Sequence, residues 1–183
     1  MDIDKRARDN LGNKSFALIG LMGAGKTTIG RMISSRIKIP FVDTDHEIEK
    51  LSSMTVKDFF LFYGEDVFRD LELQVAKMYL QGSRCILSTG GGLFLNEKIR
   101  EYIQSRGITL WLQASCDVLW SRIENSGNHP LLDGENPKEI LRSLMESRYS
   151  IYAQADMVLC SSDLSIEETT DNVIRKLADF DNY

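Results

Sequence analysis

Eight residues near the N-terminus combine glycines, a lysine and a threonine at the spacing that phosphate binding requires. The segment Gly20-Leu21-Met22-Gly23-Ala24-Gly25-Lys26-Thr27 matches the pattern G-x-x-x-x-G-K-S/T at every fixed position. Its glycines let successive backbone N–H groups face an anion, and Lys26 supplies a positive charge for the β- and γ-phosphates. The Thr27 hydroxyl is suited to ligating Mg²⁺. We therefore expect this segment to bind a nucleoside triphosphate.

The segments on either side of this loop have the character that the motif demands. The apolar run 15–19 is typical of a buried strand, and Ile29, Met32, Ile33 and Ile37 recur at helical spacing. The alternative is a glycine-rich turn that binds nothing, which the order strand, loop, helix disfavours.

Two carboxylates follow the next strand-like segment. Asp43 and Asp45 are two residues apart after Phe41-Val42, so their side chains lean the same way if strand geometry persists. One of them could hold the water shell of Mg²⁺, and the other could accept a proton from a substrate hydroxyl. The alternative is that Asp45 is the N-cap of a helix.

Arg69 and Glu72 lie three residues apart on a stretch whose apolar stripe has helical spacing. They form either a solvated surface ion pair or an arginine that binds a substrate carboxylate and is steadied by Glu72. The triple glycine 90–92 directly follows another buried strand, which indicates that the backbone approaches a ligand closely there. The segment 126–136 has two glycines and a proline and separates two helical stretches. We interpret it as a mobile flap over the site, or alternatively as a surface loop without a role.

Strand-like and helical segments alternate along the whole chain. The strands are expected at 15–19, 41–42, 85–88, 108–112 and 157–159, with helices including 67–80 and 137–152. This alternation predicts an α/β fold, a parallel sheet with helices on both faces. Ligands in such sheets bind beyond the carboxyl ends of the strands, where the phosphate loop, the two aspartates and the triple glycine all fall.

The bulk properties restrict the class of protein. A length of 183 residues predicts one domain, which we place at 15–183 after a polar N-terminal tail at 1–14. The formal net charge of −5 disfavours nonspecific binding to nucleic acid or an anionic membrane. Three dispersed cysteines, no apolar run of membrane-spanning length and no signal-like N-terminus lead us to expect a cytoplasmic protein. We also expect a monomer.

Taken together, these motifs resemble the shikimate kinase family of small P-loop kinases. The resemblance extends from about Phe16 to Leu177 and also includes Pro130-Leu131-Leu132 in the flap. It implies transfer of the γ-phosphate of ATP to the 3-hydroxyl of shikimate in aromatic amino-acid biosynthesis, with Mg²⁺ as cofactor. The implied structure is a three-layer P-loop kinase fold, with strand order 2-3-1-4-5. Residues 44–82 would form a substrate-binding helical region, and residues 126–136 a mobile lid.

The resemblance also implies roles for individual residues. Lys26, Asp45 and His129 would be catalytic, and Thr27 and Asp43 would serve the metal. The residues implied to bind ATP are Gly23, Ala24, Gly25, Lys26, Thr27, Thr28 and Arg122. The residues implied to bind shikimate are Asp45, Phe60, Phe68, Arg69, Gly90, Gly91, Gly92 and Arg148.

The sequence departs from the family pattern in the lid. His129 stands where the family has an arginine immediately before Pro-Leu-Leu, and no Lys or Arg occurs between Ser126 and Pro137. His129 could be held protonated by the substrates, Lys138 or Arg142 could have taken over the role, or catalysis could have been lost. A smaller departure is Ser150, where the family usually has proline.

Two rival functions remain open at this point. Another small P-loop kinase, acting on gluconate or a nucleotide, would share the phosphate loop and a lid. A nucleotide-binding relative without effective transferase activity would account for His129. Asp45, the Arg69–Glu72 pair and the triple glycine favour a small polyhydroxylated carboxylate as the substrate.

Overall fold

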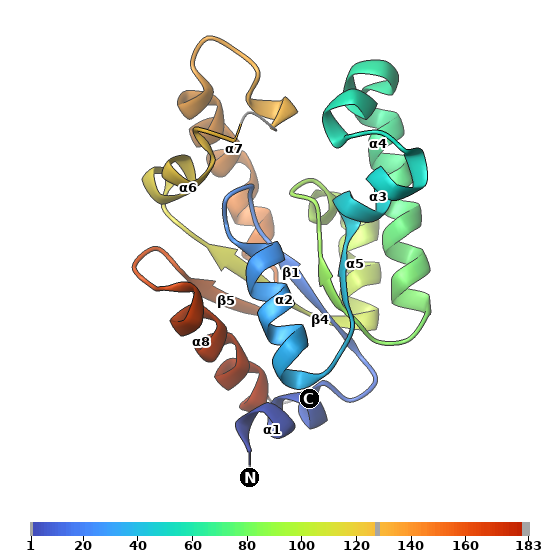
Figure 1. Cartoon of the computed structure of the whole chain (residues 1–183), viewed down its shortest axis with the longest axis vertical. Helices are drawn as coiled ribbons and strands as arrows, with labels where there is room; N and C mark the ends of the chain where they lie inside the picture. The colour runs from blue at the N-terminus through green and yellow to red at the C-terminus, as the bar shows by residue number, and fades with distance from the viewer. Residues whose placement is uncertain (1, 127–128, 181–183) are drawn as a thin grey trace.

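Five parallel strands form one sheet in a computed structural model, which describes residues 2–126 and 129–180 (Figure 1). The strands are β1 (Ser15–Ile19), β2 (Phe41–Asp43), β3 (Ile86–Ser88), β4 (Gly107–Gln113) and β5 (Met157–Cys160). Their order, β2-β3-β1-β4-β5, confirms the α/β class and the expected order 2-3-1-4-5. Each predicted strand segment agrees with an observed strand to within one residue at either end.

Helices cover both faces of the sheet. They are α1 (Ile3–Leu11), α2 (Lys26–Ile37), α3 (Thr44–Ser52), α4 (Val56–Gln81), α5 (Glu97–Arg106), α6 (Cys116–Ile123), α7 (Pro137–Tyr152) and α8 (Ile166–Ala178), with short 3₁₀ turns η1 (Leu93–Leu95) and η2 (Pro130–Leu132). Helices α1, α2 and α8 contact one another on one face, and α4 contacts α5 on the other (Figure 1). The predicted helix 137–152 is confirmed as α7, and the stretch 67–80 is part of the longer α4. Within the described residues, none of the helices combines the length and the apolar character needed to cross a bilayer.

The parallel register brings the ends of three strands together. Ser88 at the end of β3 is the register partner of Asp43 on one side and of Leu18 on the other. The phosphate loop follows β1, α3 follows β2 and the triple glycine follows β3, so all three connections leave the same edge of the sheet. This adjacency is the reason that motifs far apart in the sequence meet.

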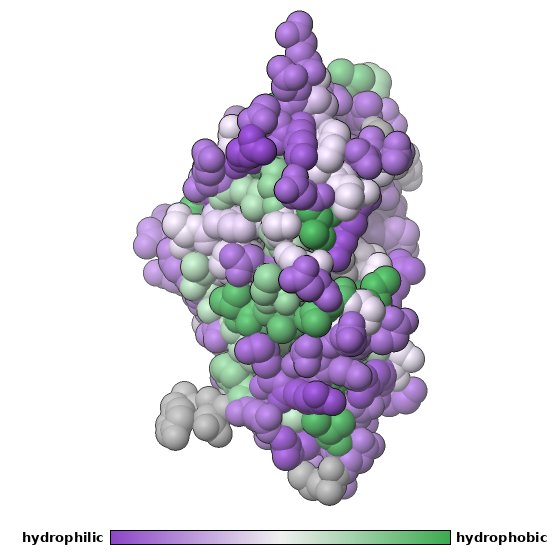
Figure 2. Space-filling model, turned by 90° about the vertical axis from the view of Figure 1, so that its left-hand side faces the viewer, coloured by the Kyte–Doolittle hydropathy of each residue, from purple (hydrophilic) through white to green (hydrophobic). Residues whose placement is uncertain are grey.

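The strands differ in burial according to their place in the sheet. Every residue of β1 and β3 is buried, because helices cover both of their faces. The edge strand β5 instead alternates buried and exposed residues, with Val158 and Cys160 on the exposed side. Seen from the side of β5, the surface is largely polar, with apolar residues gathered across its middle and in smaller areas elsewhere (Figure 2).

The α3–α4 region has a small apolar cluster of its own. Ile48 of α3 packs with Phe59, Phe68 and Val75 of α4, separately from the main core around the sheet. Helix α4 is interrupted at Gly64, which has a φ of +79° and non-helical geometry. This region therefore forms a helical unit with its own small core, and the prediction that residues 44–82 bind the substrate stays a prediction.

The polar-tail interpretation of residues 1–14 is wrong, because most of this segment is helix α1. Ile3, Ala7 and Leu11 recur every four residues and face inward, and Ala7 and Leu11 are fully buried. Charged residues dominate the segment and obscured this narrow apolar stripe.

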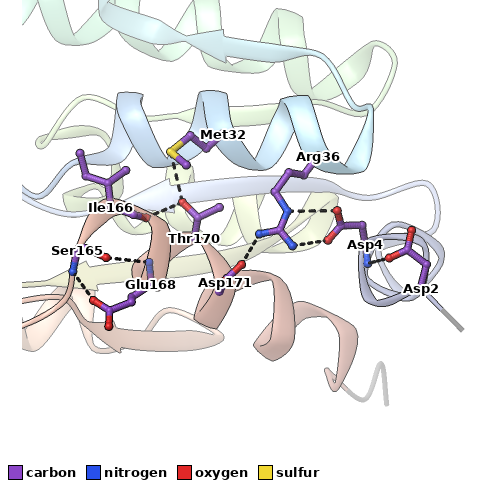
Figure 3. Close-up of polar contacts among 9 residues, drawn as sticks. All are labelled: Asp2, Asp4, Met32, Arg36, Ser165, Ile166, Glu168, Thr170 and Asp171. Carbon is purple, nitrogen blue, oxygen red and sulfur yellow. Dashed lines mark hydrogen bonds and ion pairs between the residues drawn. The ribbon is translucent and has the colours of Figure 1, made fainter.

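An ion pair and a hydrogen bond attach α1 to two other helices. Arg36, in the last turn of α2, donates to Asp4 of α1 at 2.7 and 3.1 Å and also pairs with Asp171 of α8 (Figure 3). The side-chain amide of Asn10 donates to the carbonyl of Ala178 at 2.7 Å. The N-terminal helix is thus held against the helix that follows the phosphate loop.

We predict that Leu11→Ala lowers the free energy of unfolding by about 2–5 kcal/mol, because it leaves a cavity under α1. Denaturant titration measures this change. The exposed substitution Lys5→Ala on the same helix should stay within about 0.5 kcal/mol of the wild type. Equal effects of the two substitutions would show that α1 contributes no packing.

Candidate active site

One cavity of about 810 Å³ lies at the carboxyl ends of the strands. It is lined by all of the residues that the sequence indicated: Gly23, Ala24, Gly25, Lys26, Thr27, Thr28, Asp43, Asp45, Phe60, Phe68, Arg69, Gly90, Gly91, Gly92, Arg122, His129 and Arg148. They come from the connections after β1, β2 and β3 and from α4, α6, α7 and the segment before η2. The fold therefore assembles the predicted site residues around one space.

The phosphate loop ends on a glycine that starts α2. Gly25 is the N-cap and has a φ of +91°, a conformation that side chains disfavour. The ammonium group of Lys26 donates to the carbonyls of Gly20 at 2.8 Å and Leu21 at 2.9 Å. Burial lowers the pKa of Lys26, although Asp45 and Asp43 oppose this shift. The loop thus places backbone N–H groups and one partly desolvated cation at the N-terminus of a helix, an arrangement that suits phosphate.

The two aspartates after β2 have different structural roles. The strand ends at Asp43, whose Oδ1 caps α3 by accepting from the backbone N–H groups of Asp45 at 3.1 Å and His46 at 3.4 Å. The N-cap is therefore Asp43, and the alternative that Asp45 caps the helix is wrong. Strand geometry does not persist to Asp45, which lies in the first helical turn. The Thr27 hydroxyl donates to Asp43 Oδ2 at 2.7 Å, so the two proposed metal-binding groups are adjacent.

Asp45 lines the cavity, and one oxygen of its carboxyl group, Oδ1, is buried without a protein donor among the described residues. Burial, followed by the nearby charge of Asp43, raises the pKa of Asp45 to about 6. A buried acceptor without a donor is costly, so this oxygen is suited to receive a hydrogen bond from a ligand hydroxyl.

Arg69 and Glu72 form a largely buried pair rather than a surface one. The Nη1 of Arg69 donates to Glu72 Oε2 at 2.8 Å, and the Glu72 side chain has no exposed surface. Burial raises the pKa of Glu72 to about 7 in spite of the Arg69 charge, which opposes the shift. The alternative of a solvated surface pair is therefore wrong.

The triple glycine packs directly on this pair. A Cβ atom on Gly90 would overlap Glu72 Oε1, and one on Gly92 would overlap the guanidinium of Arg69. The Gly90 N–H donates to the Thr44 hydroxyl at 2.9 Å, which ties the turn to the start of α3. The three glycines predicted that the backbone approaches a ligand closely at 90–92. In the structure this backbone also lies directly against the side chains of Arg69 and Glu72.

Two further arginines border the cavity. Arg148 is 8% exposed, and its Nη1 donates to the carbonyl of Gly91 at 3.4 Å, beside the hydroxyl of Tyr152, which also donates to Gly91. Arg122 lies near the phosphate loop and donates to the carbonyl of Gly23 at 3.1 Å. Arg148 is therefore on the glycine-turn side of the cavity and Arg122 is on the loop side.

The lid prediction falls partly on residues 127 and 128, which lie outside the described residues. His129, Pro130 and Leu131 line the cavity. Burial, and then the charge of Lys26, lowers the pKa of His129, which disfavours the imidazolium form. Lys138 pairs with Asp117 at 2.7 Å and Arg142 with Glu139 at 2.7 Å, and neither is among the described residues that line the cavity.

Sequence reasoning missed the part of the cavity that follows β5. Ser161, Leu164, Ile166 and Thr169 line it, and the carbonyl of Ser161 accepts from Arg122 at 3.5 Å. The sequence could have indicated them by their position, because they follow the last strand and the carboxyl ends of all the parallel strands meet at the same edge of the sheet.

The oxygen donors present fit a divalent cation that is shared with a ligand. No group of three His, Cys, Asp or Glu side chains within the described residues could hold a metal by itself. The Thr27 hydroxyl and the Asp43 carboxylate are hard oxygen donors, which Mg²⁺ prefers together with phosphate oxygens and water.

Comparisons with known proteins agree on one family. Residues 22–178 match the family model described as shikimate kinase. The chain is 49% identical over 172 residues to a shikimate kinase of Rhizobium leguminosarum bv. trifolii, covering 94% of this chain and 88% of that one. It is 47% identical to a shikimate kinase of Rhizobium meliloti, covering 96% and 91%.

Solved structures show the same similarity. The fold is similar to a shikimate kinase from Acinetobacter baumannii in complex with shikimate, with a TM-score of 0.87 and 30% identity over 92% of this chain and 95% of that one. A gluconokinase from Sinorhizobium meliloti, with a TM-score of 0.61 and 16% identity over 91% and 92%, shares the fold alone.

The buried carboxyl of Glu72 predicts a pH dependence of stability. Its pKa is raised from 4.5 to about 7, so between these values the folded protein binds a proton that the unfolded chain has released. Stability should therefore fall as the pH rises through this range, and Glu72→Gln should remove roughly 3 kcal/mol of that fall. Denaturant unfolding at stepped pH values measures both slopes.

The matched control for this prediction is Glu146→Gln, which removes an exposed carboxylate on α7 and should leave the slope unchanged. If Glu72→Gln and the wild type lose stability in parallel as the pH rises, the buried carboxyl is ionised throughout and the prediction fails.

Proposed function

This chain belongs to the shikimate kinase family, and on that premise we propose how its cavity carries out the transfer of the γ-phosphate of ATP to the 3-hydroxyl of shikimate. The single observation that carries the proposal is that one cavity is lined both by a phosphate loop and by arginines from α4 and α7. The phosphate loop contributes Lys26, and the arginines are Arg69 and Arg148. Asp45 lines the same cavity, and its buried Oδ1 has no donor among the residues that the structure describes.

These two sets of residues suit the two substrates. Gly23, Ala24, Gly25, Lys26, Thr27 and Thr28 bind the phosphates of ATP, and Arg122 stacks on the adenine. Arg69 and Arg148 bind the shikimate carboxylate, since a guanidinium matches a carboxylate through parallel hydrogen bonds. Phe60, Phe68 and the glycines 90–92 border the ring of the substrate. In this proposal residues 44–82 form the shikimate-binding region and residues 126–136 the lid of a single kinase domain.

Asp45 orients the attacking hydroxyl and receives its proton. The carboxylate is buried beside Lys26, and its raised pKa brings its basicity closer to neutral pH, which favours proton acceptance. Lys26 neutralises charge on the transferring phosphoryl group. Closure of the lid excludes water, which would otherwise compete with the hydroxyl. Most of the rate enhancement then comes from positioning and charge neutralisation.

The fit of the oxygen donors supports Mg²⁺ as the cofactor. Thr27 would hold the cation directly, and Asp43 would hold it through water. When bound with ATP, the cation supplies charge neutralisation at the β- and γ-phosphates.

We also propose that the protein acts as a monomer in the cytoplasm. Residues of one chain line the cavity, so the site needs no second subunit. The three cysteines are free thiols, which a reducing compartment maintains. The net charge of −5 gives no support to nucleic acid as a partner.

ADP release from ATP and Mg²⁺ tests the function, with gluconate as the control acid. We predict strong release that depends on shikimate and is absent with gluconate. Asp45→Asn should lower kcat by about 10²- to 10⁴-fold if Asp45 accepts the proton. ADP release with gluconate but not with shikimate would show that shikimate is not the substrate. An unchanged kcat in Asp45→Asn would show that Asp45 does not accept the proton.

His129 generates a separate prediction. A neutral imidazole provides no net charge beside the developing anion, whereas an arginine at this position would provide one. His129→Arg should therefore raise kcat/KM, by up to about 100-fold. Steady-state kinetics at pH 7 with both substrates varied measures the change.

His129→Gln is the control, because glutamine keeps a neutral donor. It should stay close to the wild type if the imidazole acts uncharged. A tenfold or larger drop in kcat/KM for His129→Arg would contradict this account of the lid.

A further inference from the structure

The guanidinium of Arg69 is enclosed on its faces. The rings of Phe68 and Phe60 lie 5.3 and 5.8 Å from its central carbon, measured to the ring centroids. Gly92 approaches so closely that a Cβ atom there would overlap the guanidinium. A substrate carboxylate can therefore reach Arg69 only through the N–H groups on its edges.

Carboxylates of the protein already accept hydrogen bonds from all three nitrogens. Glu72 accepts from Nη1 at 2.8 Å, and Glu65 Oε1 accepts from both Nε at 3.2 Å and Nη2 at 2.9 Å. Two-point binding of a carboxylate uses either the Nε–Nη2 edge or the Nη1–Nη2 edge. Glu65 holds the first edge, and Glu72 accepts from Nη1, which is one side of the second edge. A third carboxylate therefore competes with at least one of them.

The two glutamates differ in how easily they can leave. Glu72 has no exposed surface, so separating it from Arg69 would strand a charge in the interior. The Glu65 side chain is 50% exposed and can move into water, which solvates it. Glu65 is therefore the carboxylate that gives way.

We propose that Glu65 is a built-in competitor of the substrate: it holds the Nε–Nη2 edge of Arg69 until the carboxylate of shikimate displaces it, and it thereby lowers the affinity for shikimate. This inference rests on the proposed function, in which Arg69 binds that carboxylate. The displacement is an exchange of ion pairs and involves no covalent step.

The position of Glu65 limits the strength of the competition. Glu65 directly follows the non-helical Gly64 and is four residues before Arg69, the favourable orientation for a helical ion pair. Half-exposed pairs of this kind are weak, so the substrate pays only a modest penalty for displacing it.

The test is the steady-state kinetics of Glu65→Gln and Glu65→Ala. Both should lower the KM for shikimate about two- to fivefold, the range that a weak exposed ion pair allows. The change should appear in KM rather than in kcat, and the KM for ATP should not follow it. A KM for shikimate that is unchanged or higher in both variants would overturn the proposal, since Glu65 would then be neutral or would position Arg69.

The matched control is Asp66→Asn, which removes one exposed negative charge at the next residue. Among the described residues, Asp66 has no hydrogen bond or ion pair with Arg69. The KM of Asp66→Asn for shikimate should stay closer to the wild-type value than the KM of either Glu65 variant does. If Asp66→Asn lowers KM as much as Glu65→Gln, general repulsion of an anionic substrate accounts for the effect and the proposal fails.

Two further measurements separate this inference from its premise. Arg69→Lys should raise the KM for shikimate tenfold or more, because lysine cannot bind a carboxylate through a planar fork. A normal KM in Arg69→Lys would overturn the premise and with it the inference. An analogue whose carboxylate is replaced by a hydroxymethyl group should show no gain in Glu65→Gln, and an equal gain would refute competition for Arg69.

Discussion

The part of the cavity around Arg69 depends on one contact. The Glu72 carboxyl group is buried beneath the glycine turn 90–92, which follows β3. The buried carboxyl group needs Arg69 beside it as a hydrogen-bond donor, and the turn can lie over the pair only where Gly90 and Gly92 lack side chains. The same turn donates from Gly90 to Thr44, the first residue of α3. The position of Asp45, which follows Thr44, is therefore coupled to the Arg69–Glu72 pair, so the residues proposed to bind the substrate carboxylate and hydroxyl form one structural unit.

The charges of the cavity are balanced within the protein. Burial lowers the pKa of Lys26 and raises those of Asp45 and Glu72, whereas each cation partly offsets the shift of the neighbouring acids. Anionic ligands alter this balance, because a phosphate favours the charged form of Lys26 and a substrate carboxylate competes for Arg69. The cavity therefore combines permanently charged arginines, such as Arg69 and Arg148, with three groups whose protonation depends on what is bound. His129 adds a fourth such group in place of a permanent charge at the lid.

The sequence was most informative where a local pattern has one physical explanation. The buried strands were found to within a residue, because runs of apolar residues bounded by glycine and polar residues leave little choice. Helix α1 was missed because only Ile3, Ala7 and Leu11 face the core, and the charges that surround them are typical of a tail. The wall after β5 was missed because Ser161, Leu164 and Thr169 carry no chemical signature; only the position of the strand in the sheet makes them part of the cavity.

The sequence by itself determined which residue types line the cavity, and these are the donors and acceptors that phosphate, a hydroxyl and a carboxylate require. The tertiary structure decided which structural role each of these residues has. The end of β2 made Asp43 the helix cap and left Asp45 with an unpartnered oxygen, a difference that two aspartates in one short segment do not reveal. Burial separated Glu72 from Glu65, although both lie within one or two helical turns of Arg69. The physical reason is that solvent exposure, which controls the strength of an ion pair and the pKa of a carboxyl group, is a property of the packed fold and not of the residue.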